Sequence, residues 1–313
     1  MIAWQPTASI ETLKARAVFL ANIRAFFAAR EVWEVQTPLL GRYAGTDLHL
    51  DPFVVQSLGS LRYLQTSPEY AMKRLLAAGS GSIYQLCPAF RQEEQGRRHN
   101  PEFTILEWYR VEWGYEALMQ EVDALCQFLL GTPPATIVTY EALFQEHYQI
   151  SAAGCTLEAL TPLVRQHAHY DGPLASKDEA LLLLLSEIEP KFGQEAPVFL
   201  TEYPPTQAVL AELVAGEQGL VAQRFELYYK GYELANGFQE LRDPIEQVAR
   251  FRADNQLRVQ SHKPSIPIDT ALLAALEYLP RTSGVAMGVD RMFMLHMGLS
   301  TIDQVLAFSF DRV

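Results

Sequence analysis

A long charged segment between two apolar stretches constrains the fold of this chain more than any other feature. The segment spans residues 91–102, and β-prone residues flank it at 82–87 and 103–109. The pattern predicts two antiparallel strands joined by a long loop. The loop is too long for a tight hairpin and is rich in arginine, histidine, asparagine and glutamate, which is typical of a binding loop. A solvated charged turn is the alternative.

The alternation of side chains along these strands favours the binding loop. Residues two apart share a face of a strand, so Arg91 and Glu93 point together before the loop. After the loop, Phe103, Glu107 and Tyr109 share a face in the same way. A guanidinium can bind phosphate, an aromatic ring can stack on a base, and a carboxylate can accept a hydrogen bond from an amine. The set predicts a nucleotide site, with a structural hairpin as the alternative.

Several motifs then resemble one enzyme family. Phe90–Glu93 followed by Arg98–Thr104 resembles motif 2 of the class II aminoacyl-tRNA synthetases, and Gly284–Arg291 is similar to their motif 3. Within the family the lysyl branch is the most similar, on the following segments: Ser67–Tyr70, Lys73–Leu75 and Glu233–Glu240. The resemblance covers almost the whole chain in order. The shortness of the chain and two substitutions resemble the relatives that attach (R)-β-lysine to elongation factor P.

The resemblance implies an α+β fold, an antiparallel β-sheet flanked by helices. Residues 1–313 would form a single catalytic domain, with about 132–200 as an insertion packed on the core. A helix at 9–30 and a strand at 32–40 ended by Pro38 resemble motif 1, which forms the dimer interface in the family. We therefore expect a homodimer. No anticodon-binding domain is expected, because motif 1 begins near Ser9.

Local signals predict further elements. Ser9 is a suitable N-cap for the first helix. A strand at 61–66 should run into a helix that ends near Ala78 and has Ser67 as its N-cap. A helix is predicted at 115–130, a long strand at 225–241, and a strand followed directly by a helix in motif 3.

The resemblance also implies the chemistry, which is ATP-dependent activation of an amino acid followed by transfer to an acceptor amine. The expected catalytic residues are Arg91, Glu233 and Arg291. The expected ATP-binding residues are Arg91, Gln92, Glu93, His99, Asn100, Phe103, Glu233, Leu234, Gly288 and Arg291. The expected substrate-binding residues are Ser67, Pro68, Glu69, Glu107, Tyr109, Asn236, Phe238, Glu240 and Ala286. Glu233 and Glu240 would hold Mg²⁺, which suits paired carboxylates.

The spacing of those two glutamates raises a difficulty. Glu233 and Glu240 are an odd number of residues apart, so a regular strand would place them on opposite faces. If both serve one site, a bulge or bend must lie between them, and Asn236–Gly237 is the expected place. Without the resemblance, an acidic edge strand would be the favoured interpretation.

Two positions depart from the lysyl pattern. Ser67 stands where those synthetases usually have alanine, and Ala286 stands where they have glycine. The methyl of Ala286 would crowd an α-amino group, and the hydroxyl of Ser67 could hydrogen-bond an amine displaced to the β carbon. These changes predict a preference for (R)-β-lysine.

Composition limits the alternatives. The formal charge is −12, with 37 acidic and 25 basic residues, and no basic run is visible, so we expect no stable tRNA complex. The three cysteines suggest packed thiols, and the lack of a membrane-spanning apolar run suggests a cytoplasmic protein without membrane contact. The resemblance implies that the acceptor is a lysine of elongation factor P. The alternatives are a truncated synthetase-like enzyme that activates α-lysine for tRNA or another acceptor, and an inactive binding or regulatory paralogue.

Overall fold

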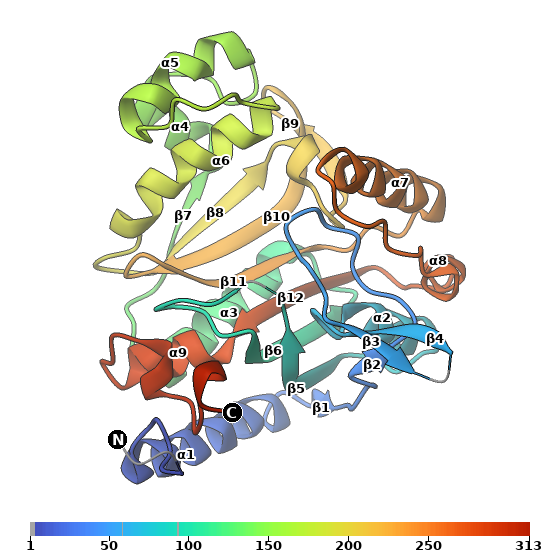
Figure 1. Ribbon diagram of the computed structural model, residues 1–313, viewed down its shortest axis with the longest axis vertical. Coiled ribbons are helices and arrows are strands. Elements are labelled where there is room, and N and C mark those ends of the chain that lie inside the picture. The colour runs from blue at the N-terminus through green and yellow to red at the C-terminus, as the bar shows by residue number, and fades with distance from the viewer. Residues whose placement is uncertain (1–3, 58, 93) are drawn as a thin grey trace. The chain divides into compact units, whose positions relative to one another are not determined.

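The computed structural model describes residues 4–57, 59–92 and 94–313, and the chain divides into two compact units (Figure 1). Unit 1 comprises Met1–Gly114, Phe128–Leu130 and Leu241–Val313. Unit 2 comprises Tyr115–Gln127 and Gly131–Glu240. The prediction that residues 1–313 form a single domain stays a prediction.

The sheet of unit 1 is built on the predicted long-loop hairpin. Strands β5 (Ile83–Phe90) and β6 (Glu102–Val111) pair antiparallel, with Phe90 opposite Glu102. Strand β12 (Thr282–Gly288) pairs antiparallel with the other edge of β6, and the short β1 (Trp33–Glu34) pairs parallel with β5. The hairpin prediction is therefore confirmed, and the charged loop connects β5 to β6.

The helices of unit 1 begin close to where the sequence signals place them. Helix α1 (Ile10–Ala28) has Ser9 as its N-cap, whose side chain accepts a hydrogen bond from the Thr12 amide. Helix α9 (Val289–His296) follows β12 directly, as predicted. The remaining helices are α2 (Glu69–Ala77), α7 (Pro244–Gln260) and α8 (Thr270–Leu276). The ring of Phe27 on α1 stacks on that of Tyr84 with centroids 4.4 Å apart, which anchors α1 to the sheet.

Two predictions in unit 1 need correction. The strand expected at 32–40 is reduced to β1 and the two-residue β2 (Leu40–Gly41). The ladder stops because Thr37 donates its amide to the side chain of Gln85, at 3.1 Å, and Pro38 has no amide hydrogen. Helix α2 begins at Glu69, one residue after the predicted start at Pro68, but Ser67 keeps its predicted capping role, because its hydroxyl accepts a hydrogen bond from the Glu69 amide at 3.1 Å.

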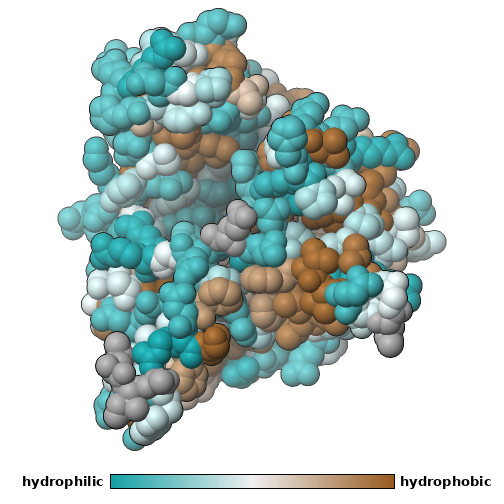
Figure 2. Space-filling view, viewed as in Figure 1, coloured by the Kyte–Doolittle hydropathy of each residue, from teal (hydrophilic) through white to brown (hydrophobic). Residues whose placement is uncertain are grey.

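A second, smaller sheet in unit 1 has the strand order β2–β4–β3. Its other strands are β3 (Val54–Ser57) and β4 (Ser60–Leu64), the latter close to the predicted strand at 61–66. Exposed apolar side chains lie on this sheet, namely Leu40, Val54 and Leu61. Figure 2 shows an apolar patch on the side where Figure 1 draws these strands.

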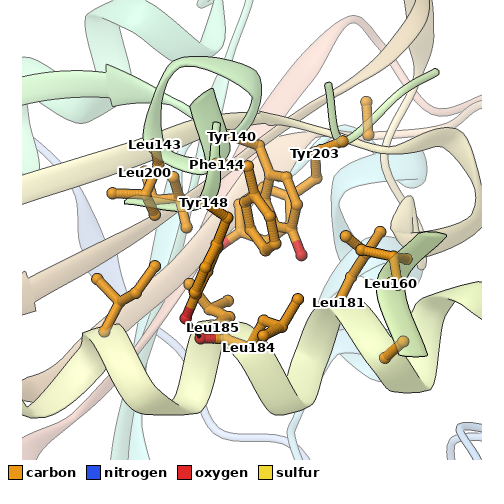
Figure 3. Close-up of a cluster of buried hydrophobic side chains, with 14 of the residues drawn as sticks. Tyr140, Leu143, Phe144, Tyr148, Leu160, Leu181, Leu184, Leu185, Leu200 and Tyr203 are labelled. Atoms are coloured by element: carbon orange, nitrogen blue, oxygen red, sulfur yellow. Dashed lines mark hydrogen bonds between the residues drawn. The ribbon is translucent and has the colours of Figure 1, made fainter. Parts of the chain in front are cut away.

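Unit 2 contains its own group of paired strands and its own hydrophobic core. Strand β10 (Gly219–Tyr229) pairs antiparallel with β11 (Tyr232–Gln239). It also pairs antiparallel with β8 (Val198–Tyr203) and with β9 (Leu213–Gly216). Strand β7 (Thr136–Thr139) pairs parallel with β8. The helices are α4 (Tyr140–Tyr148), α5 (Leu157–His167), α6 (Lys177–Ile188) and most of α3 (Tyr115–Leu130). Figure 3 shows aromatic residues of α4 and leucines of α6 in one buried cluster, in which Tyr140 stacks on Phe144 at 4.7 Å. The segment 132–200 thus supplies helices and strands to this unit.

The long strand predicted at 225–241 is wrong as a single strand. The chain reverses at Lys230 and Gly231, which both have positive φ, 51° and 73°, and so joins β10 to β11 as a hairpin. Two successive residues with positive φ suit the right-handed twist of a two-residue hairpin. The pattern of apolar residues continues through the turn, so it gave no signal of the reversal.

The α+β prediction is confirmed, because helices accompany sheets whose pairs are mostly antiparallel. The exceptions are β1 with β5 and β7 with β8, which are parallel. Within residues 4–57, 59–92 and 94–313, no helix has the length and apolar character needed to cross a membrane.

The turn at Gly231 generates a testable prediction. Gly231→Ala should destabilise the protein by about 2–4 kcal/mol. The alanine would have to adopt the positive φ of Gly231, and its Cβ would lie 2.7 Å from the Pro190 carbonyl oxygen. Gly131→Ala is the matched control, since Gly131 has φ 67° but nothing lies within 4 Å of its added Cβ. It should cost only about 1–2 kcal/mol. Urea unfolding of both variants measures the difference, and equal losses would contradict the clash.

Candidate active site

The phosphate-binding residue predicted in unit 1 lies beside the predicted base-stacking residue. The guanidinium carbon of Arg91, after the end of β5, is 5.0 Å from the ring centroid of Phe103 near the start of β6. Arg91 also forms an ion pair with Glu94, with Nη1 and Oε1 3.4 Å apart. The amide of Gln92 donates to the Asp51 carbonyl at 2.8 Å. Strand pairing therefore brings a cation and an aromatic face together at the entrance of the loop.

The charged loop also meets the start of α9. The Arg291 guanidinium is in close contact with the His99 ring, and Arg291 Nε donates to the Arg98 carbonyl at 3.4 Å. Partial burial and the nearby Arg291 charge lower the pKa of His99, so its ring is neutral near pH 7 and can accept from Arg291. The guanidinium groups of Arg91 and Arg291 are suited to bind phosphate.

Other predicted ATP-binding residues have structural roles in this unit. The Asn100 side chain donates to the Glu102 carbonyl at 2.6 Å and accepts from the Phe310 amide at 3.0 Å, which ties the loop to the end of the chain. Gly288 ends β12 opposite Ile105. Contact of Asn100 and Gly288 with ATP stays a prediction, and Glu93 lies outside the described residues.

A buried carboxylate organises the predicted amine pocket. Glu107 on β6 is only 2% exposed and accepts hydrogen bonds from the Ser67 hydroxyl at 2.6 Å and the Tyr109 hydroxyl at 2.7 Å. Ala286 on β12 is the cross-strand partner of Glu107. The two residues that depart from the lysyl pattern therefore both adjoin Glu107, Ser67 through a hydrogen bond and Ala286 as its strand partner. The hydroxyl that we expected to face a substrate amine also donates to Glu107.

A second carboxylate lies near the first. Glu69, in the first turn of α2, pairs with Lys73 one turn later, with Oε1 and Nζ 2.6 Å apart. Burial, followed by the charge of Glu69, raises the pKa of Glu107 to about 7. Lys73, which is 1% exposed, partly offsets this effect. It was not among the expected site residues, although its i, i+4 spacing from Glu69 was a usable signal.

In unit 2, a polar network surrounds the predicted substrate residue Asn236. Arg224 Nε donates to the Asn236 carbonyl oxygen at 3.3 Å, and the Asn236 amide nitrogen is 3.5 Å from Glu226. Glu226 lies opposite Asn236 in the β10–β11 register. Its carboxylate also accepts the hydroxyls of Tyr203 at 2.6 Å and Tyr228 at 2.5 Å. Arg224 and Glu226 were missed because their proximity to Asn236 depends on the hairpin.

A bulge on β11 resolves the spacing of the two predicted metal ligands. Leu227 pairs with Ala235 and Tyr228 pairs with Glu233, which leaves Leu234 as an extra residue. One extra residue reverses the alternation, so Glu233 shares a face with Asn236. The bulge predicted between the glutamates is confirmed, but it lies at Leu234 rather than at Asn236–Gly237.

The remaining residues of this strand differ in exposure. Leu234 is buried at 2% exposure, while Glu233 and Phe238 are half-buried, and Phe238 packs against the unit 2 core. Glu240 is 1% exposed and forms a bridge with Ala211. Among the described residues, no group of three His, Cys, Asp or Glu could hold a metal ion. The half-buried Glu233 suits Mg²⁺ that takes other ligands from phosphate and water.

The sequence of this chain is similar to those of known proteins. Residues 2–312 match the family described as tRNA synthetases class II (D, K and N). The chain is 47% identical to the elongation factor P–(R)-β-lysine ligase of Haemophilus ducreyi, over 99% of this chain and 97% of that protein. It is 48% identical to the ligase of the same name from Vibrio cholerae, over 99% of this chain and 98% of that protein.

The environment of Glu107 predicts an unusual titration. The Glu107 carboxyl should titrate near pH 7, because its pKa is raised to about 7. Ser67→Ala should raise this pKa further, since the Ser67 hydrogen bond lowers it, and Glu69→Gln should lower it by removing a negative charge. The measurement is ¹³C NMR of the glutamate carboxyl carbons, with Glu107→Gln to assign the signal. Titration near the ordinary value of 4.5 would contradict the buried environment.

Proposed function

The chain belongs to the class II tRNA synthetases of the D, K and N group, and on this premise we propose that it is an ATP-dependent ligase that attaches (R)-β-lysine to elongation factor P. The enzyme activates (R)-β-lysine as an aminoacyl-adenylate and then transfers the acyl group to a lysine side chain of the factor. The observation that carries this assignment is that Ser67 and Ala286 both adjoin the buried Glu107.

The nucleotide is bound by the unit 1 loop and α9. Arg91 contacts the α-phosphate, Phe103 stacks on the adenine, and Arg291 contacts the other face of the base or the terminal phosphates. Gln92, Glu93, His99 and Asn100 complete this end of the site, with Gly288 allowing close approach of the backbone. The proximity of Arg91 to Phe103, and of Arg291 to His99, supports these roles.

The first step requires no side-chain nucleophile. The substrate carboxylate attacks the α-phosphorus of ATP, the bond to the bridging oxygen breaks, and pyrophosphate leaves. Arg91 and Arg291 stabilise the charge that develops on the phosphate oxygens, and positioning supplies the rest. In the second step, the amine of the acceptor lysine attacks the acyl carbon of the adenylate and AMP leaves.

Carboxylates bind the amino groups of the substrate. In unit 1 these are Glu69 and Glu107, together with the Tyr109 hydroxyl, and Pro68 fixes the start of α2. The residues of unit 2 in this role are Asn236, Phe238 and Glu240. Glu107 must be charged to bind an ammonium group, and its raised pKa links substrate binding to pH near 7. The Ser67 hydroxyl favours the charged form, since its hydrogen bond lowers that pKa.

We propose Glu233 and Glu240 as the residues that hold Mg²⁺, and Leu234 as a backbone contact of the nucleotide. Bound Mg²⁺ would neutralise phosphate charge. The bulge at Leu234 supports a shared face for the two glutamates, and the half-burial of Glu233 leaves it accessible to a hydrated ion.

The assembly is proposed to be a homodimer through the motif 1 region. Exposed apolar side chains of α1 and β1 support this surface, namely Ile10, Val18 and Trp33. The net charge of −12 favours a protein acceptor over a stable tRNA complex. Because elongation factors act where translation occurs, we propose a cytoplasmic location without membrane contact. The segment 132–200 would be an insertion of a single catalytic domain.

Arg91→Ala tests the activation step. The variant should lose pyrophosphate exchange by at least about 100-fold, because it lacks the charge-assisted contact to the reacting phosphate. Arg97→Ala, an exposed arginine of the same loop, is the matched control and should retain near-normal exchange. Near-normal exchange by folded Arg91→Ala would rule out the assigned role of this arginine.

Ser67 and Ala286 test the amino acid assignment. The wild type should prefer (R)-β-lysine to α-lysine, and Ala286→Gly should relax this preference about tenfold. Ser67→Ala should lower kcat/KM for β-lysine by the equivalent of about 1 kcal/mol, because one hydrogen bond is lost. The measurement is kcat/KM in pyrophosphate exchange with each lysine, with the KM for ATP as an internal control. Acyl transfer to elongation factor P and to lysine tRNA then identifies the acceptor. Equal use of both lysines, or charging of tRNA alone, would favour the truncated synthetase.

A further inference from the structure

A buried ion pair joins helix α1 to helix α9 in unit 1. The Asp290 carboxylate, in the first turn of α9, is 3% exposed and pairs with the guanidinium of Arg16 on α1. Its second oxygen accepts a hydrogen bond from the Thr104 amide on β6 at 2.8 Å. Arg16 Nη2 also donates to the Thr104 hydroxyl at 2.9 Å. Arg16, Thr104 and Asp290 therefore form a closed cluster, here named the clamp, which connects three elements that are distant in sequence.

Each end of the clamp adjoins a residue of the nucleotide site. Thr104 follows Phe103, which is proposed to stack on adenine, and Asp290 precedes Arg291, which is proposed to contact the base or phosphates. Alternation on β6 turns Thr104 away from the face of Phe103, and adjacent residues of a helix also diverge. The clamp therefore lies behind the site, where it can fix the backbone without touching the ligand.

The energetics favour a role in placement over a role in stability. A buried ion pair gives little net stability compared with apolar side chains of similar size, because both charges lose their hydration. It does impose directional hydrogen bonds on both partners. An error of about 1 Å at a reacting group can cost about 100-fold in rate, so backbone placement of Phe103 and Arg291 has a large effect.

We propose that Arg16 and Asp290 are positioning residues for ATP, which hold Phe103 and Arg291 at their working separation through Thr104. This inference rests on the proposed function only in taking ATP as the ligand. It assigns a role to helix α1 in nucleotide binding, although no residue of that helix is expected to touch the nucleotide.

The test compares Arg16→Met with the matched control Arg24→Met. Arg24 lies on the same helix and pairs with Glu34 on β1, but its side chain is 48% exposed, whereas that of Arg16 is 14% exposed. Arg16→Met should weaken ATP binding about tenfold in titration calorimetry and raise the KM for ATP similarly, with the KM for the lysine substrate within about twofold of wild type. Arg24→Met should leave the ATP affinity, the KM for ATP and the KM for the lysine substrate unchanged.

Two milder variants keep the test informative if Arg16→Met does not fold. Asp290→Asn retains the shape of the side chain and the acceptor for the Thr104 amide, and Arg16→Lys retains the positive charge. Each variant should therefore raise the KM for ATP less than Arg16→Met does, and should leave the KM for the lysine substrate unchanged. Equal losses for ATP and lysine, or unchanged ATP binding in a folded variant, would overturn the inference. If wild type itself binds no ATP, the proposed function fails instead, so the two failures are distinguishable.

Discussion

The pairing register of three strands determines which side chains can act together in unit 1. Because β5, β6 and β12 pair antiparallel, each residue of β6 from Ile105 to Tyr109 has a fixed partner on both sides, such as Gln85 and Ala286 beside Glu107. A shift of one residue would turn Glu107 and Tyr109 to the opposite face. The residues proposed to bind the nucleotide depend on the same register, since it brings Arg91 to Phe103 across the open end of the hairpin.

Buried charge in this unit is tolerated because each group has specific partners. Glu107 is shielded from water but receives two hydroxyl donors, and Glu69 is paired with Lys73. Desolvation still dominates at Glu107 and raises its pKa to about 7, so the carboxyl can gain or lose a proton near neutral pH. A cationic substrate would favour the charged form, which gives the pocket a physical basis for selecting amino groups.

Unit 2 achieves a comparable arrangement by a different means. The turn at Lys230–Gly231 folds β11 back on β10, and the bulge at Leu234 then changes which residues share a face. Asn236 is held by Arg224 and Glu226, and Glu226 is held in turn by the hydroxyls of Tyr203 and Tyr228. Both tyrosines belong to the hydrophobic core of this unit, so helices α4, α5 and α6, which also pack in that core, support the polar network indirectly.

The sequence alone determined the features that depend on near neighbours. Alternation and loop composition predicted the β5–β6 hairpin, the Ser9 cap predicted the start of α1, and the small residues of 284–288 predicted a strand that leads into α9. The odd spacing of Glu233 and Glu240 predicted a bulge on the condition that both glutamates serve one site. Only the tertiary structure located that bulge at Leu234, divided 225–241 into a hairpin, and shortened the strand at 32–40. It also brought Arg16 to Asp290, 274 residues apart, and Ser67 to Glu107, 40 residues apart. The physical reason is that hydrophobic alternation and capping act over a few residues, whereas pairing partners, buried charge and turn position are set by packing between segments that the sequence leaves far apart.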